Sequence, residues 1–263
     1  MAATRRIRLG ISTCLLGRPV RYDGRDKLDP FLAETWGRYV DYVPVCPEVE
    51  CGFGVPRETT DLHGDPHSPR LIGNETGRDR TDEMLDWTRE RLDGLAGEEL
   101  DGYVFRCKSP ACALRTAKIK TAGGRTRRGM GLFARGFVER FPLVAVEEDL
   151  ALRAPGGREA FLERVFTLRR WRELLGRRKS ARALAAFHAA HRLAVMSHGR
   201  RALRELDEVA AGGAGTTPSQ LYAAYQAALL DALRRPATGH RPDLAGQSYL
   251  SPEALELLLR HPD

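Results

Sequence analysis

The chain has 263 residues, of which 42% are hydrophobic and 29% charged, and its formal net charge is +7. This length and composition predict a globular protein of one large or two modest domains and exclude a disordered chain. The sequence shows neither the run of about 20 apolar residues that a membrane span needs nor a signal-peptide core, so its five cysteines are expected to stay reduced. We therefore expect a cytoplasmic protein and not a disulfide scaffold.

The first half of the chain alternates predicted strands with predicted helices. Apolar runs predict strands at 7–12, 40–45, 101–106 and 143–146, and helical spacing predicts helices at 30–38, 81–95 and 129–140. A loop rich in Gly, Pro and Asp covers residues 47–77, and a connection of that length is usually functional or mobile. This order predicts an α/β fold with a mostly parallel sheet covered on both faces.

The second half of the chain is predicted to be helical throughout. Strand signals end near the Ala-Pro-Gly-Gly sequence at 154–157, and helical patterns follow at 159–175, 180–211 (one long helix or two) and 218–233. A last short helix is predicted to begin with Ser251 as its cap. We therefore divide the chain into an α/β domain, residues 1–154, and an all-α C-terminal domain, residues 155–263.

Positive charge is concentrated in the middle of the chain. Residues 101–200 contain 22 Lys and Arg against 8 Asp and Glu, and two runs, 106–128 and 164–182, hold eight basic residues each. Such clustering is typical of proteins that bind a polyanion, with RNA and DNA the commonest partners. The alternative is a solvated helix face in a protein that uses arginine in place of lysine.

Three cysteines follow three of the predicted strands. Cys14, Cys46 and Cys112 each lie in a Gly- or Pro-rich loop at a strand's carboxyl end, and these ends form one edge of a parallel sheet. Thiols that meet in a reducing compartment indicate a metal or a catalytic role, and three thiolates would suit an iron–sulfur cluster with one iron lacking a protein ligand. The alternative is packing as small apolar side chains, which we expect of Cys51 and Cys107.

Four ordered motifs between residues 7 and 146 resemble the thiouracil desulfidase (TudS-like) family. They are Ser12-Thr-Cys-Leu-Leu-Gly17, Val20-Arg-Tyr-Asp-Gly24, Val45-Cys-Pro-Glu-Val49 with Gly54-Val-Pro-Arg57, and Ser109-Pro-Ala-Cys112. The second half resembles a helical domain often fused behind that family, with His188-Ala-Ala-His191 and Met196-Ser-His198 as its recognisable core. In this two-domain form the chain resembles enzymes that remove sulfur from 4-thiouridine in tRNA, which implies tRNA as a partner.

The resemblance implies a cofactor and roles for particular residues. Cys14, Cys46 and Cys112 would hold a 4Fe-4S cluster through three irons and leave the fourth open. Glu48 would act as general acid/base, and Ser109 would assist near the reacting sulfur. Judged from the residues alone, Glu48 is equally well a surface acid or a helix-cap partner, and Ser109 a turn residue before a proline.

Other residues of the motifs carry weaker expectations. Arg21, Tyr22 and Asp23 are expected to line the substrate pocket, with ordinary loop packing as the alternative. The family usually reads Ser-Pro-Ser-Cys-Gly around the last cysteine, whereas this chain has Ala111 and Ala113. The cysteine is retained, but the turn and any polar contact from position 111 are expected to differ.

The three histidines of the helical half allow two interpretations. His188 and His191 are three residues apart and share a helix face, which would allow a metal pair, but we favour helix–helix hydrogen bonds for them and for His198. For the whole chain, the leading hypothesis is an iron–sulfur desulfidase acting without net redox change on thiolated uracil within tRNA. The alternatives are a desulfidase of free thiouracil and a non-catalytic iron–sulfur protein that binds nucleic acid.

Overall fold

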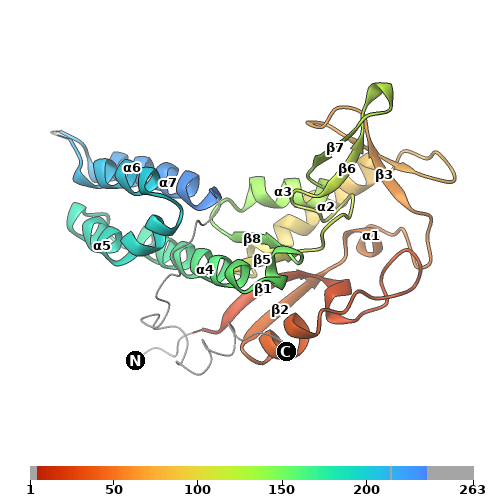
Figure 1. Ribbon diagram of the computed structural model, residues 1–263, viewed down its shortest axis with the longest axis horizontal. Helices are drawn as coiled ribbons and strands as arrows, with labels where there is room; N and C mark the ends of the chain where they lie inside the picture. The colour runs from red at the N-terminus through yellow and green to blue at the C-terminus, as the bar shows by residue number, and fades with distance from the viewer. Residues whose placement is uncertain (1–4, 214, 236–263) are drawn as a thin grey trace.

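The structure is a computed structural model that describes residues 5–213 and 215–235 (Figure 1). The strands are β1 (Ile7–Ser12), β2 (Val40–Val45), β3 (Thr60–His63), β4 (Arg70–Gly73), β5 (Gly102–Phe105), β6 (Ala117–Lys120), β7 (Thr126–Gly129) and β8 (Ala145–Glu148). The α-helices are α1 (Pro47–Glu50), α2 (Thr81–Ala96), α3 (Leu132–Arg140), α4 (Pro155–Leu175), α5 (Ala181–Ser197), α6 (Arg200–Ala211) and α7 (Pro218–Arg234).

The central sheet is parallel, as the order of strands and helices predicts. Its strands run β2-β1-β5-β8, and every neighbouring pair is parallel. Strands β1 and β2 occupy the predicted residues, β5 is one residue shorter at each end, and β8 begins two residues later than predicted. The α/β class and the helical second half are both confirmed.

The two faces of this sheet contribute to two hydrophobic cores. Leu9 and Val104 pack in one core with α4, whereas Tyr103 and Phe105 pack in the other with α3 and α2. This division follows from the alternation of side chains along each strand. Gly102 lets α4 approach closely, because a Cβ at that position would lie 2.9 Å from the ring of Phe161.

A second sheet, with strand order β4-β3-β6-β7, was not predicted from the sequence. It joins two antiparallel hairpins, β3–β4 and β6–β7, through a parallel pairing of β3 with β6. On one face of this sheet, Leu62 and Ile119 pack in the core that contains α2. The interpretation of residues 47–77 as a loop is therefore wrong, since that segment contains α1, β3 and β4. Strands of four residues with few apolar positions give almost no periodic signal.

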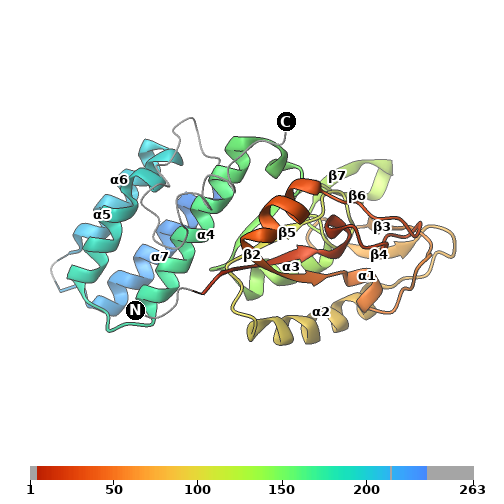
Figure 2. The same cartoon turned by 90° about the horizontal axis from the view of Figure 1, so that it is seen from below.

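The helical half packs directly on the central sheet. Helix α4 lies between the sheet and α5–α7 (Figure 2), and one hydrophobic core extends from Leu9 through Trp171 to Leu206 and Tyr225. The predicted segment 180–211 forms two helices, α5 and α6, which break at Gly199. The helix predicted after Ser251 lies outside the described residues. The division into two domains at residue 154 stays a prediction, and α4 begins at the next residue.

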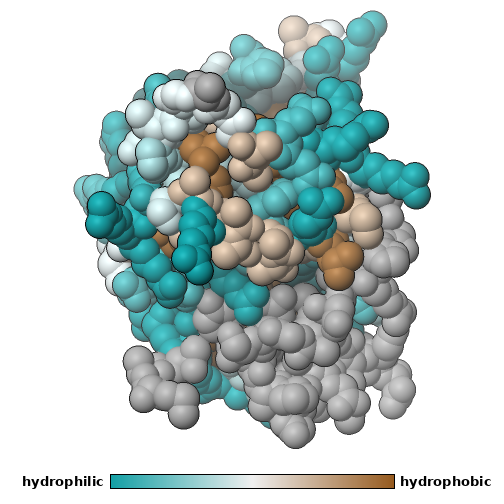
Figure 3. Space-filling model, turned by 90° about the vertical axis from the view of Figure 1, so that its left-hand side faces the viewer, coloured by the Kyte–Doolittle hydropathy of each residue, from teal (hydrophilic) through white to brown (hydrophobic). Residues whose placement is uncertain are grey.

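The end of the molecule formed by the C-terminal helices is largely hydrophilic. In Figure 3, hydrophilic side chains lie on both sides of a smaller apolar area on the described part of this face. Along the described part of the chain, none of the helices combines the length and the apolar character that a bilayer span needs.

A buried carboxylate ties α4 to the sheet at its amino edge. Asp101, directly before β5, is fully buried, and it receives hydrogen bonds from Arg5 (3.0 Å), Arg172 (2.7 Å) and the backbone N–H of Arg8 (3.0 Å). Arg169 of α4 lies 3.5 Å from the same carboxylate. A charge removed from water in this way is stable only while its partners remain in place.

We expect Asp101→Ala to lower the free energy of unfolding by about 3–5 kcal/mol, because it leaves buried arginines without their counter-charge. Chemical denaturation followed by circular dichroism measures this change. The matched control is Asp93→Ala, which removes an exposed carboxylate 3.6 Å from Arg140 and should leave stability nearly unchanged. Equal stability of the two variants would contradict this account.

Candidate functional site

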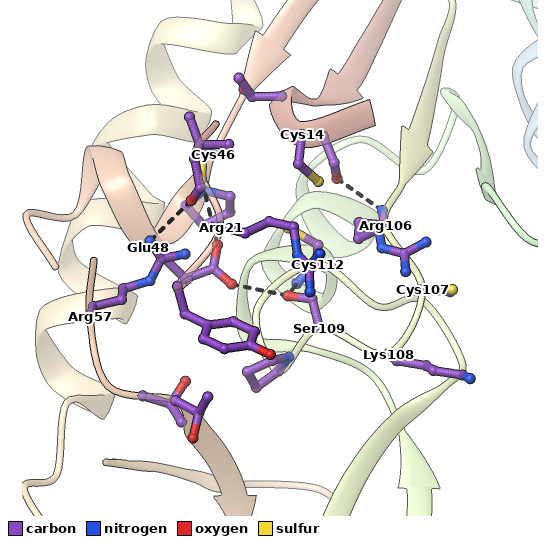
Figure 4. A pocket seen from close by; sticks show the side chains of 18 of the residues that line it. Cys14, Arg21, Cys46, Glu48, Arg57, Arg106, Cys107, Lys108, Ser109 and Cys112 are labelled. Atoms are coloured by element: carbon purple, nitrogen blue, oxygen red, sulfur yellow. Dashed lines mark hydrogen bonds between the residues drawn. The ribbon is translucent and has the colours of Figure 1, made fainter. Parts of the chain in front are cut away.

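A pocket of about 400 Å³ opens at the carboxyl edge of the central sheet (Figure 4). Its walls come from the segments that follow β1, β2 and β5, together with the start of β3. This is the edge at which open α/β sheets bind ligands, and the volume lies in the usual range for a small-molecule site.

Cys14, Cys46 and Cys112 all line this pocket and are 8%, 9% and 4% exposed. Cys14 lies in the 3₁₀ turn after β1, Cys46 is the cap residue directly before α1, and Cys112 lies in the loop after β5. Burial raises the pKa of Cys14 to about 11 and that of Cys46 to about 12, and it also raises the pKa of Cys112. Negative charge on Glu48, and on Cys46 and Cys14 when they ionise, further raises the pKa of Cys112. The three cysteines thus share one buried pocket.

The chemistry of these three side chains fits a thiolate-bound iron group. Buried thiols with raised pKa values are neutral at pH 7, and a positively charged centre would offset the cost of ionising them. Across residues 5–213 and 215–235, no three Cys, His, Asp or Glu side chains are arranged to hold a single metal ion. Ligands of a cluster bind different irons and need not converge on one point, so wider spacing of the sulfurs is compatible with a cluster.

Glu48 and Ser109 meet inside the pocket. The Ser109 hydroxyl donates to Oε1 of Glu48 at 3.1 Å, and the other carboxylate oxygen lies 3.9 Å from the Cys46 sulfur. The same serine oxygen accepts the backbone N–H groups of Ala111 (3.1 Å) and Cys112 (2.9 Å). Ser109 therefore shapes the turn that carries Cys112 and also orients the carboxylate of Glu48.

The position of Cys46 and Glu48 follows from a short helix start. Pro47 occupies the first position of α1, where a missing N–H costs nothing. The carboxylate of Glu50, the last residue of α1, accepts the backbone N–H of Cys46 at 2.8 Å and so satisfies the cap residue. Arg91 of α2 holds Glu50 in turn, at 2.9 Å. Glu48 is thereby left free to face the pocket.

The segment after Cys14 supplies one wall of the pocket. Arg21 and Tyr22 line it, whereas Asp23 accepts the backbone N–H of Arg25 at 3.1 Å and belongs to the turn itself. Arg57, from the third family-like motif, donates to the carbonyl oxygens of Val20 (3.0 Å) and Gly54 (2.9 Å). Arg57 thus joins the two segments, a role that the sequence reasoning did not assign.

Two acidic residues at the end of β8 anchor the loop that carries Ser109 and Cys112. Glu148 accepts the backbone N–H groups of Arg115 (2.8 Å) and Thr116 (3.1 Å) and the Thr116 hydroxyl (2.9 Å). Asp149 accepts the Cys107 N–H at 2.7 Å and pairs with Arg106. The sequence reasoning missed both anchors. The acidic sequence directly after the fourth predicted strand could have indicated these two residues.

The two alanines that depart from the usual family motif are both fully buried. Ala111 and Ala113 pack in the core beneath α2 and α3. The Ala111 carbonyl lies so close to Gly131 that a Cβ there would approach its oxygen to 2.4 Å. The loop is therefore pressed against the start of α3, and an apolar side chain suits position 111 here. Cys107, expected to pack as a small apolar residue, is buried but also lines the pocket.

The histidines of the helical half make hydrogen bonds between and within helices. His188 on α5 contacts the Tyr225 hydroxyl on α7 (3.0 Å) and the Asp207 carboxylate on α6 (2.7 Å). His191 contacts the carbonyl of Phe187 and His198 that of Arg235, each at 2.7 Å. Burial lowers the pKa of both His191 and His198. These contacts agree with the interpretation that favours helix packing over a metal pair.

Comparison with known proteins assigns the chain to a family. The sequence profile of 2-thiouracil desulfurase matches residues 9–149, more than half of the chain. The chain belongs to the 2-thiouracil desulfurase family. One similar solved structure is described as a [4Fe-4S]-dependent thiouracil desulfidase, TudS; it is 24% identical, the match covers 56% of this chain and 93% of that one, and the TM-score is 0.44. No curated protein matches the chain. The part that matches the family contains the whole pocket, including all three cysteines, Glu48 and Ser109.

We expect Glu148→Ala to lower the free energy of unfolding by about 2–3 kcal/mol, because two backbone donors and one hydroxyl lose their acceptor. Loosening of the 106–116 loop should also appear as new proteolytic cleavage within it. Glu139→Ala, which removes an exposed glutamate from α3, is the matched control. Unchanged stability and an unchanged cleavage pattern in Glu148→Ala would show that the loop is held by other contacts.

Proposed function

We propose that this protein replaces sulfur with oxygen in thiolated uracil, with 4-thiouridine in tRNA as its substrate, and releases sulfide. Family membership and the meeting of three thiols, a carboxylate and a hydroxyl in one pocket support this proposal. The reaction is hydrolytic. One C–O bond to water forms, the C–S bond breaks, and no electrons are gained or lost overall.

We further propose that Cys14, Cys46 and Cys112 hold a 4Fe-4S cluster by three irons and leave the fourth open. When bound, such a cluster supplies a soft Lewis acid suited to a thiocarbonyl sulfur. The cysteine-lined pocket supports this assignment, because burial disfavours free thiolates there and so favours a cationic partner. Reduced thiols and an oxygen-sensitive group are consistent with a cytoplasmic protein.

Glu48 is the group that moves protons in this proposal. Its carboxylate is oriented by the Ser109 hydroxyl (3.1 Å) and faces the same space as the cysteines. It accepts a proton from the water that attacks the ring carbon and returns it to the departing sulfide. Ser109 holds the carboxylate in that position, while Arg21 and Tyr22 provide the wall against which a uracil ring would lie.

A base within folded RNA must leave its stack to reach such a pocket. The pocket lies between surface loops, and its lining includes the positive side chains of Arg21 and the exposed Lys108. These features support entry of a nucleotide whose phosphates remain outside. Incubation with tRNA that contains 4-thiouridine and with free 4-thiouracil distinguishes the proposed substrate from the free base.

We expect Cys14→Ala to abolish both the near-ultraviolet and visible absorbance of the anaerobically reconstituted cluster and the release of sulfide from thiolated tRNA. Cys51→Ala is the matched control, because Cys51 packs outside the pocket, and it should retain both properties. Iron and sulfide content per chain provides a measurement that does not depend on activity. Full activity in Cys14→Ala would exclude the proposed mechanism.

We expect Glu48→Gln to lower kcat for sulfide release by about 10²–10⁴-fold while the cluster absorbance stays unchanged, since a general acid/base contributes about that factor. Glu58→Gln serves as control, because Glu58 also lines the pocket but binds Thr76 (2.7 Å) and two backbone N–H groups. A Glu48→Gln variant with wild-type kcat would remove Glu48 from the mechanism.

A further inference from the structure

The basic residues of the two runs divide in the structure into those held by carboxylates and those that are exposed. In the second run, Arg164 pairs with Glu147 (2.7 Å), and Arg169 and Arg172 contact the buried Asp101. These arginines attach α4 to the sheet. Their charge therefore stabilises the fold and is not available to a partner.

The first run contains a hairpin whose charges are exposed. Residues 117–129 form β6, a tight turn and β7, and the basic hairpin comprises Lys118, Lys120, Arg125, Arg127 and Arg128. All five side chains are exposed. Among the described residues, only Lys120 of this set has an ion-pair partner, Asp61, at 2.7 Å. The hairpin projects at the upper right of the molecule in Figure 1.

The register of the hairpin places like charges opposite each other. Lys118 is paired with Arg128 across the two strands, and such a pair destabilises a sheet when nothing lies between the charges. Ala117 and Ile119 point into the core, so Lys118, Lys120 and Arg128 share the outer face. A bound anion would offset the repulsion between these like charges.

The outer face of the hairpin leads into the catalytic pocket. Strand β6 pairs in parallel with β3, with Leu62 beside Ile119, so Asp61 lies on the same outer face as Lys118 and Lys120. Asp61 also lines the pocket. An RNA strand whose base occupies the pocket would therefore continue across the basic hairpin. The distance between pocket and hairpin is a few strand spacings of about 5 Å each.

We propose that the basic hairpin binds the phosphates that flank the thiolated nucleotide, so that RNA is held by its backbone on the outer face of the second sheet. This inference rests on the proposed function, since it assigns the RNA contact for that same pocket. Exposed cations suit a series of phosphodiesters, and in the basic hairpin all but Lys120 lack an ion-pair partner among the described residues. The nearby pocket accepts the base.

A second group of exposed cations provides a matched control. Arg177 and Arg178 follow the carboxyl end of α4. This helix begins after β8, and Arg172 near its carboxyl end contacts Asp101. A helix of 21 residues is about 30 Å long, so these arginines lie near the opposite edge of the central sheet from the pocket. Replacing both arginines removes two positive charges, as the hairpin variant does, but far from the pocket.

The test compares the double variants Lys118→Gln/Arg128→Gln and Arg177→Gln/Arg178→Gln. Affinity for an unmodified tRNA transcript, measured by fluorescence anisotropy at several salt concentrations, should fall about tenfold in the hairpin variant. The slope of log K against log salt should fall by about 0.7–0.9 for each phosphate that the variant no longer neutralises. The control variant should bind as the wild type does. The thermal midpoint of the hairpin variant should not fall, because a repulsive pair is removed.

Turnover of free 4-thiouridine should be unchanged in both variants, because neither alters the pocket. Wild-type affinity in the hairpin variant, or an equal decrease in the control, would overturn the inference. A wild-type protein without affinity for tRNA would overturn the inference together with its tRNA substrate. Hairpin-dependent tRNA binding without sulfide release would refute the proposed function and leave the RNA-binding surface intact.

Discussion

The structure depends on bringing three thiols, far apart in sequence, to one edge of a parallel sheet. Because β1, β2 and β5 run in the same direction, the residues that follow them meet at one end, and Cys14, Cys46 and Cys112 line a single pocket there. Burial makes these thiols poor anions, so the site favours a cation that can share their charge. Glu48 and Ser109 bring a carboxylate and a hydroxyl into the same space. The chemistry of the family is compatible with this arrangement.

The rest of the fold keeps this edge in place. Glu148 and Asp149 hold both ends of the loop that carries Ser109 and Cys112, and Gly131 allows that loop to pack against α3. At the opposite edge of the sheet, the buried Asp101 fixes α4 and with it the helical half. Charge in this protein therefore occurs in two settings. Buried pairs fix the loops and α4, whereas the hairpin of β6 and β7 carries basic side chains that are exposed.

The sequence predicted the features that rest on long patterns or on order along the chain. The parallel sheet followed from the alternation of strands and helices, and the position of the cysteines followed from their place after strands. The second sheet could not be predicted, because strands of four residues such as Thr60–His63 hold a single buried apolar side chain. Arg57, Glu148 and Asp149 were missed because their roles arise from contacts between distant segments. The two basic runs looked alike in sequence, and only tertiary contacts separate the paired arginines of α4 from the exposed hairpin.

The most direct test of the three-thiol site is Mössbauer spectroscopy of protein reconstituted with ⁵⁷Fe, recorded with and without 4-thiouridine. If Cys14, Cys46 and Cys112 hold three irons of a four-iron cluster, one iron in four should differ from the others, and its signal alone should shift when the thiolated ligand is added. Four irons that respond alike to the ligand, or the absence of any four-iron species in the wild-type protein, would contradict the account.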